Sequence, residues 1–216
     1  MLTMIAAGVF APTIAAAATP RATSGQPYWS ITMGGGYFIP AVDGWKDQYG
    51  KSGGWIPYLA GSYRLIPHLA VVADAAVFSA EGTARTISGG VSAQQQRLTL
   101  YPLTLGAEVD LGFSSAQWIV PFLGAGYRHV IYRLSVELQD RIDGGANGVA
   151  GWGGLDLLLD RLDPSSASGL SEDLGVRHTY LRLEAQWSSV SASNSQGGDD
   201  IDLGGMTYLA ALRFAF

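Results

Sequence analysis

Hydrophobic and polar residues alternate with a period of two along most of the chain. In the stretch from Arg177 to Ser188, Leu181 and Leu183 fall on one parity, and Arg182 and Glu184 fall on the other. This period places alternate side chains on opposite faces of an extended strand. The pattern recurs between Gly-, Ser-, Asp- and Asn-rich connections, which predicts eight β-strands. The predicted strands are Tyr28–Ile39, Trp55–Leu65, His68–Ser79, Arg97–Leu111, Ile119–Arg133, Val149–Leu159, Arg177–Ser188 and Met206–Phe216.

Two properties of these strands indicate which face meets which environment. The apolar parities are rich in Leu, Val and Ala and carry aromatic residues near their ends, as in the girdles of a membrane barrel. These aromatic residues are Trp29, Tyr37, Trp55, Tyr63, Tyr101, Tyr127, Trp187 and Tyr208. The opposite parities carry mid-strand charges beside small residues such as Gly106 and Gly124, which suits a narrow interior. We therefore expect an all-β fold, an eight-stranded antiparallel up-and-down transmembrane β-barrel whose apolar side chains face lipid. A soluble secreted barrel that binds a ligand is the alternative.

The connections between the predicted strands alternate in length. Those after the second and fourth strands are the short sequences IPH and GFSSAQ, and those after the first, third, fifth and seventh are long and polar. The loops after the third and fifth strands are predicted at Glu81–Gln96 and Val136–Gly148. This alternation is typical of long outer loops and short periplasmic turns. The connection after the sixth strand, DRLDPSSASGLSEDLG, is too long for a short turn. Either it contains a short helix on the periplasmic side, or the sixth strand is misplaced.

Charged residues in the middle of the strands fall on the predicted interior parity. They are the cations Arg64, Arg128, Arg182 and Arg213 and the anions Asp74, Glu108, Asp156 and Glu184. Because an unpaired buried charge costs several kcal/mol, we expect these residues to form an ion-pair network that fills the lumen. The alternative is that they are ordinary solvated charges on the strand faces.

The chain begins with an apolar run, MLTMIAAGVFAPTIAAAATPRA, which contains Pro12 and an Ala-x-Ala sequence at Ala16–Ala18. These features predict a signal peptide at residues 1–18 and a barrel domain at 19–216. The first residues of this run, where a signal peptide usually carries positive charge, contain no Lys or Arg. A membrane helix is the alternative, but the run is at the short end of the roughly 17–25 residues that such a helix needs.

The composition narrows the classes of partner and chemistry. Charged residues make up 14% of the chain, and the net charge of -5 offers no basic surface, so nucleic acid is not an expected partner. Without cysteine, disulfides, thiolate metal sites and Cys nucleophiles are excluded, and we expect no cofactor and no metal. The histidines are His68, His129 and His178. His129 is the candidate for enzymatic chemistry, but Ser135 lies six residues away, too far for a direct His–Ser pair.

The last strand, MTYLAALRFAF, places Tyr208, Ala210, Leu212, Phe214 and Phe216 on one parity. Together with the strand pattern over roughly Gln26 to Phe216, this ending resembles the small eight-stranded outer-membrane β-barrel family of Gram-negative bacteria, the OmpA/OmpX-type and OmpW-type barrels. The resemblance implies that these five residues are an assembly signal, read by the barrel-assembly machinery. It also implies a monomer in the outer membrane, with outer-membrane lipids and lipopolysaccharide as partners.

Within this family resemblance three functions stay open. The first is a structural or surface-interaction protein whose lumen is plugged by ion pairs, without enzymatic activity. The second is a narrow pore for small solutes, including hydrophobic ones. The third is a lipid-A-modifying enzyme, for which His129 would be the test residue.

Overall fold

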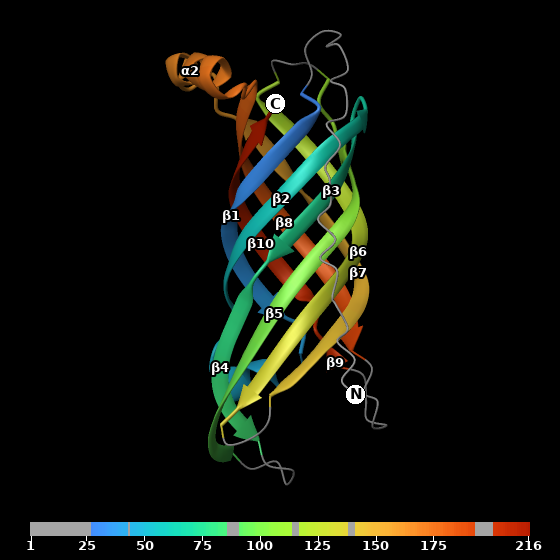
Figure 1. The fold of residues 1–216 in the computed structure, drawn as a ribbon, viewed down its shortest axis with the longest axis vertical. Coiled ribbons are helices and arrows are strands. Elements are labelled where there is room, and N and C mark those ends of the chain that lie inside the picture. The colour runs from blue at the N-terminus through green and yellow to red at the C-terminus, as the bar shows by residue number, and fades with distance from the viewer. Residues whose placement is uncertain (1–26, 43, 86–90, 114–116, 138–140, 193–200) are drawn as a thin grey trace, which may run out of the picture.

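The computed structural model shows a closed, elongated β-barrel (Figure 1). The structure describes residues 27–42, 44–85, 91–113, 117–137, 141–192 and 201–216. The predicted signal peptide at residues 1–18 lies outside this described part of the chain. The strands are β1 (Trp29–Pro40), β2 (Gly54–Ile66), β3 (Leu69–Ala76), β4 (Phe78–Arg85), β5 (Val91–Asp110), β6 (Ile119–Val136), β7 (Ile142–Leu158), β8 (His178–Ala192), β9 (Ile201–Asp202) and β10 (Gly205–Ala215).

These strands occupy eight antiparallel positions around the barrel wall. We call each position a stave, and a stave consists of one strand or of two strands that follow each other in line. β3 and β4 follow one another along one stave and are separated only by Val77, and the two-residue β9 pairs with the end of β8. Hydrogen bonding runs in the order β10-β1-β2-β3-β5-β6-β7-β8, and β8 pairs with β10 to close the cylinder. The predicted fold class is therefore confirmed.

The outward face of the barrel is apolar and the inward face carries the charges. Leu105 is 60% exposed and Leu123 is 69% exposed, whereas Arg182 is 3% exposed. A soluble barrel would show the reverse arrangement, with leucines converging on a core. The predicted facing is confirmed, and the alternative of a soluble secreted barrel is wrong.

The two ends of the barrel differ. At the short-turn end, defined by the β2–β3 and β5–β6 connections, β1 begins and β10 ends; this end is uppermost in Figure 1. The helix α2 (Pro164–Leu174), in the connection between β7 and β8, lies at the same end (Figure 1). Of the two explanations for that long connection, the helix is the correct one. The opposite end, which we call the loop end, carries the β1–β2, β4–β5 and β6–β7 connections and the five-residue helix α1 (Trp45–Tyr49).

Three predicted boundaries are wrong at the loop end. Most of the predicted loop Glu81–Gln96 belongs to β4 and β5, and half of the predicted loop Val136–Gly148 belongs to β7. The third predicted strand is interrupted at Val77. For the two predicted loops, the physical reason is that the strands extend past the barrel proper, as β4 and β5 do in Figure 1. Strand ends with polar residues on both faces lose the apolar alternation by which strands are recognised.

Within the described residues, the structure contains no helix of the length and apolar character that a membrane crossing requires.

Candidate functional site in the barrel lumen

Arg182 on β8 is the centre of a buried ion-pair cluster in the lumen. Its Nε and Nη2 donate to the two oxygens of Asp156 at 2.8 and 2.9 Å. Its Nη1 and Nη2 donate to the two oxygens of Glu108 at 3.0 and 2.8 Å. A longer bond of 3.4 Å reaches Glu184, and the guanidinium carbon lies 3.8 Å from the ring centroid of Phe122. Paired bonds to two carboxylates use the planar fork of the guanidinium fully.

Arg213 on β10 extends the cluster toward the short-turn end. Its Nη1 donates to Asp156 at 2.6 Å and lies 3.5 Å from Glu108, and its Nε donates to the hydroxyl of Ser30 at 3.0 Å. Asp156 and Glu108 thus each contact two guanidinium groups. Glu108 also accepts a 3.0 Å hydrogen bond from the indole nitrogen of Trp152.

Arg128 on β6 extends the cluster toward the loop end. Its Nη2 lies 3.9 Å from Asp74 and donates to Gln186 at 2.8 Å, while its Nε donates to Thr104 at 2.8 Å. Gln186 in turn donates to Glu184 at 2.6 Å, which connects this group to Arg182. Each charge in the cluster has a partner, as a low-dielectric interior demands.

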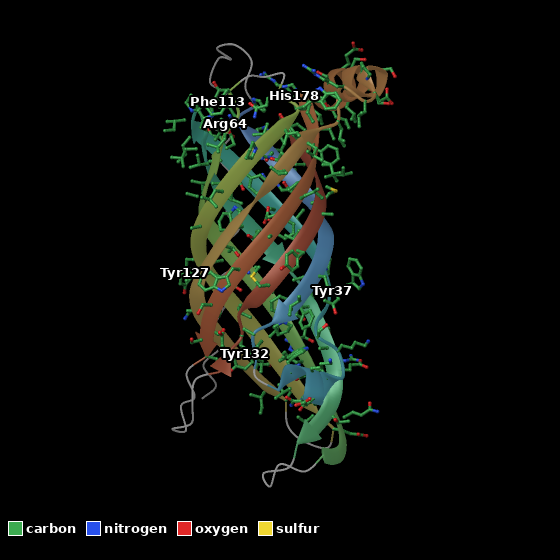
Figure 2. The ribbon with its side chains drawn as sticks, turned by 180° about the vertical axis from the view of Figure 1, so that it is seen from behind. Tyr37, Arg64, Phe113, Tyr127, Tyr132 and His178 are labelled. Atoms are coloured by element: carbon green, nitrogen blue, oxygen red, sulfur yellow. The ribbon has the colours of Figure 1, made fainter. Side chains whose placement is uncertain are left out.

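Seven of the eight predicted interior charges come together in this cluster, and Arg64 does not. Arg64 lies near the short-turn end (Figure 2), where it donates to Asp110 at 2.8 Å. Asp110 also lies 3.2 Å from His68, which occupies the β2–β3 turn with a positive φ of 71°. A cavity of about 60 Å³ opens here and reaches inward as far as Asp156 and Arg213. We call this cavity the vestibule.

Several partners of the predicted charges were not among the predicted set. Asp110, Gln186, Thr104 and Trp152 all lie on the inward parity of their strands, so parity is the signal by which they could have been found. Trp152 is accommodated because β6 has glycine beside it. A Cβ on Gly124 would lie 2.3 Å from the Trp152 ring, so any larger residue would displace the indole from Glu108.

The half of the lumen nearer the loop end is apolar rather than ionic. A small chamber of about 20 Å³ lies between Asp74, Arg128 and Gln186 of the cluster and a group of apolar side chains that includes Phe38, Ile56, Phe78, Leu100, Val130 and Leu209. The prediction that the charge network fills the lumen therefore needs correction. The network occupies its middle, and these inward apolar side chains fill the remainder.

The helix α1 packs over the apolar half. Trp45 is buried, stacks on Tyr49 with ring centroids 3.9 Å apart, and lies 5.8 Å from the Phe78 ring. Gly44 and Gly50 flank the helix in the left-handed conformation, with φ values of 70° and 67°, which favour glycine. The hydroxyl of Tyr49 accepts a 3.1 Å hydrogen bond from Gln96. Burial raises the pKa of Tyr49 above its ordinary value, and the Gln96 hydrogen bond opposes part of that rise.

The barrel wall beside this chamber contains an interruption in strand pairing. β2 pairs with β3 as far as the partners Tyr58 and Ala76, and beyond Val77 the stave continues as β4, which pairs with β5. Among the described residues, no β2–β4 ladder continues the β2–β3 ladder. We call this interruption the β2–β4 seam.

The histidines lie outside the ion-pair cluster. His129 is on the outer wall, where its Nδ1 lies 2.6 Å from the Asn147 side-chain oxygen, which also accepts a 2.6 Å hydrogen bond from Tyr127. His178 lies 2.7 Å from Asp160 at the short-turn end. No serine is recorded as a histidine partner in the described part of the chain, and no cluster of three metal-ligating side chains occurs there.

The residues of the predicted assembly signal face outward from the closing strand. Tyr208 is 52% exposed and Leu212 is 41% exposed on β10, with Ala210 between them and Phe214 beyond. Phe216 stacks on Trp29 of β1, with ring centroids 3.9 Å apart. The strand that ends the chain is thus joined to the strand that begins the barrel, along a continuous ladder from Ser30–Ala215 to Pro40–Gly205.

The closed barrel with its apolar exterior is shared with solved outer-membrane proteins. The structure of OprG from Pseudomonas aeruginosa matches with a TM-score of 0.58 and 16% identity, over 88% of this chain and 97% of that one. The chain has the fold of the small eight-stranded outer-membrane barrels. Neisserial surface protein A matches with a TM-score of 0.55 and 16% identity, over 89% of this chain and 100% of that one.

A third structure of this fold is Ail, the attachment invasion locus protein of Yersinia pestis, solved in complex with the heparin analogue sucrose octasulfate. It matches with a TM-score of 0.53 and 14% identity, over 88% of this chain and 99% of that one. Comparison with protein-family models and with curated proteins finds no match. At these identities the likeness shows the fold, a closed eight-stranded barrel whose outward side chains are apolar. In outer-membrane barrels of this fold, the short turns face the periplasm and the long loops face outward.

Proposed function

We propose that this protein is a non-conducting outer-membrane barrel with a structural or surface-interaction role. The supporting observation is the buried cluster around Arg182, whose side chain is 3% exposed and bonded to carboxylates from β5, β7 and β8. Bonds that cross the lumen between non-adjacent strands obstruct the route along the barrel axis. The apolar chamber and α1 obstruct it again nearer the loop end.

The surface available for interaction is the projecting part of β4 to β7. Of the arginine side chains that the structure describes there, Arg97 pairs with Glu81 on β4, and Arg133 and Arg141 pair with Asp143 on β7. The sulfated ligand in the Ail structure calls for unpaired cations, so these paired arginines favour a partner other than a sulfated polysaccharide. We propose a partner recognised through mixed polar contacts on this projection.

Conductance in planar bilayers tests the sealed lumen. The purified barrel should give no steady single-channel current, whereas a variant with Arg182→Ala and Glu108→Ala should conduct, because the bonds across the lumen are gone. A steady current from the wild-type protein would overturn the proposal. Thr99→Ala, on the outer face of β5, serves as the control and should behave as the wild type.

The surface role is tested with a variant that lacks the β4–β5 projection. Removal of residues 81–96 shortens the hairpin and leaves the lumen cluster in place. Cells that express this variant should adhere less to surfaces than cells that express the wild type, with equal amounts of folded barrel in the outer membrane. Equal adhesion would remove the surface role and leave a structural one.

A second candidate function is the passage of small apolar solutes, favoured by the apolar chamber and the β2–β4 seam beside it. A solute that enters from the loop end cannot cross the ion-pair cluster and would have to leave sideways through the seam. The chamber holds little more than one water molecule, so α1 would have to move first. Saturable binding of an apolar fluorophore, abolished by Val130→Trp inside the chamber, would favour this candidate.

The remaining partners belong to the same proposal. We propose that the barrel is a monomer in contact with lipopolysaccharide and that its last strand is read by the barrel-assembly machinery, with Phe216→Ala slowing insertion. No enzymatic activity is part of the proposal. Loss of lipid-A acyl chains on expression, abolished by His129→Ala, would contradict it.

A further inference from the structure

The helix α2 extends sideways from the barrel at the short-turn end. It projects beyond the outline of the wall in both views, with its axis across the long axis of the barrel (Figures 1 and 2). No residue of the helix is buried. An eleven-residue helix is marginally stable by itself in water, so an unburied helix in this position needs a reason to persist.

The helix has one apolar and one polar face. At 3.6 residues per turn, Ala167, Leu170 and Leu174 fall on one stripe, and Ser165 and Glu172 fall on the opposite side. Leu174 is 65% exposed. Just before the helix, Leu162 is 71% exposed. Ala167 and Leu170 are half-buried, so the apolar stripe is partly covered near its middle and exposed at Leu174.

Both ends of the helix are fixed. Asp163 caps the first turn by accepting a 3.1 Å hydrogen bond from the backbone of Ser166, and Gly175 ends the helix in the left-handed conformation with φ of 72°. Next to this segment, Val176 is buried and the Arg177 backbone donates to Ala215 at 2.8 Å. The helix thus has two fixed ends, is joined to the barrel after its last residue, and buries none of its side chains fully.

The lipid-facing wall continues into this segment. Arg161 lies over the ring of Trp118 at 5.8 Å, and Trp118 is 51% exposed on the outer wall. Phe113, at the same end of the barrel (Figure 2), is 85% exposed. Aromatic residues at this height are the usual mark of a membrane–water interface. The helix therefore begins next to the membrane boundary.

We propose that α2 lies on the periplasmic leaflet and places its Ala167–Leu170–Leu174 stripe at the boundary between phospholipid headgroups and acyl chains. Amphipathic helices bind in this plane when one face is apolar and the other polar. The charges of the helix are Glu172 and Asp173, with no Lys or Arg. Contact with acyl chains rather than attraction to anionic headgroups therefore drives the binding. The helix is an anchor that fixes the depth and tilt of the barrel.

The absence of cysteine from the chain makes a direct test possible. Single spin labels are attached to Leu174→Cys on the apolar stripe and to Ser168→Cys on the polar face, in the folded protein inserted into phosphatidylethanolamine–phosphatidylglycerol vesicles. The label at 174 should collide with oxygen severalfold more often than with a water-soluble nickel complex. The label at 168 should show the reverse. Leu183→Cys, on the lipid-facing wall, gives the reference for full membrane exposure.

Each other outcome overturns the proposal. Two water-exposed labels mean that the helix stands off the membrane. Two labels shielded from both reagents mean that protein covers the helix, and loss of that shielding when the protein is diluted in lipid identifies a second copy of the chain. Both substitutions are at exposed positions, and heat-modifiable gel migration checks that each variant is folded. The result should be the same in vesicles of phosphatidylethanolamine and phosphatidylcholine alone, because the helix carries no cation.

Discussion

Replacing Arg182 with leucine removes the cation at the centre of the lumen. The wild-type side chain makes five hydrogen bonds to the carboxylates of Asp156, Glu108 and Glu184. After the change Arg213 still contacts Asp156 at 2.6 Å and Glu108 at 3.5 Å, but Glu184 keeps only its bond from Gln186. The three carboxylates that Arg182 contacted are then left with one directly bonded guanidinium, that of Arg213.

The expected cost follows from the burial of these groups. Removing one partner of a buried ion pair typically costs about 3–5 kcal/mol, because the remaining charge is desolvated in the folded protein and no opposite charge compensates for it. Hydrogen bonds to charged groups contribute about 1.5–3 kcal/mol each, but those that share one guanidinium are not additive. We therefore expect Arg182→Leu to lower the free energy of unfolding by about 3–5 kcal/mol.

Urea titration of the barrel refolded in detergent micelles, followed by tryptophan fluorescence and gel migration, measures this loss. Arg133→Leu is the matched control, because that arginine is 45% exposed and pairs with Asp143 outside the lumen; it should cost at most about 1 kcal/mol. Adding Glu108→Gln to Arg182→Leu should restore about 0.5–3 kcal/mol by removing an excess carboxylate. A smaller loss of free energy of unfolding in Arg182→Leu than in the control would refute the reasoning. A double variant that lost the sum of the two single losses would refute it as well.

Three further predictions concern the lipid-facing wall, the packing of Trp152 against β6, and Tyr49 on α1. Leu183→Arg, on the lipid face, should cost about 2–4 kcal/mol in vesicles, and a harmless substitution would mean that the facing is inverted. Gly124→Leu should displace Trp152 from Glu108 and shift the fluorescence emission of the folded barrel, and an unchanged spectrum would show that the indole has room to move. Because the pKa of Tyr49 is raised on folding, its contribution to stability is complete below the unfolded value near 10 and is lost as the pH rises above it. The absorbance at 295 nm of the folded wild type minus that of folded Tyr49→Phe should show one tyrosine that ionises at a higher pH than in the unfolded chain, and ionisation at the unfolded value would contradict the raised pKa.

The orientation of the strands was predictable because lipid imposes a strict period of two. Leu183 and Arg182 are adjacent in sequence, yet one must face acyl chains and the other cannot, so parity alone separated wall from lumen. The partners of Arg182 were not predictable in the same way. Asp156 is its cross-strand neighbour only in the observed β7–β8 register, and Glu108 reaches it from β5, on another stave.

Three features of the structure could not be predicted, because the alternation of apolar and polar residues does not reveal them. Leu98 and Leu100 face the lumen although they resemble lipid-facing residues, because an apolar interior leaves no polar parity to mark the inward face. The start of β7 at Ile142 falls in a glycine-rich stretch that is typical of a turn. The break at Val77 leaves the apolar alternation intact, so it shows only in the pairing.

The vestibule determines from which end of the barrel solvent reaches the buried charges. It connects Asp156 and Arg213 to the short-turn end, whereas apolar side chains cover the cluster from the loop end. Solvent and ions at the short-turn end therefore have a route to Asp156 and Arg213. A change of salt or pH on that side of the membrane is the one to which this part of the cluster is open.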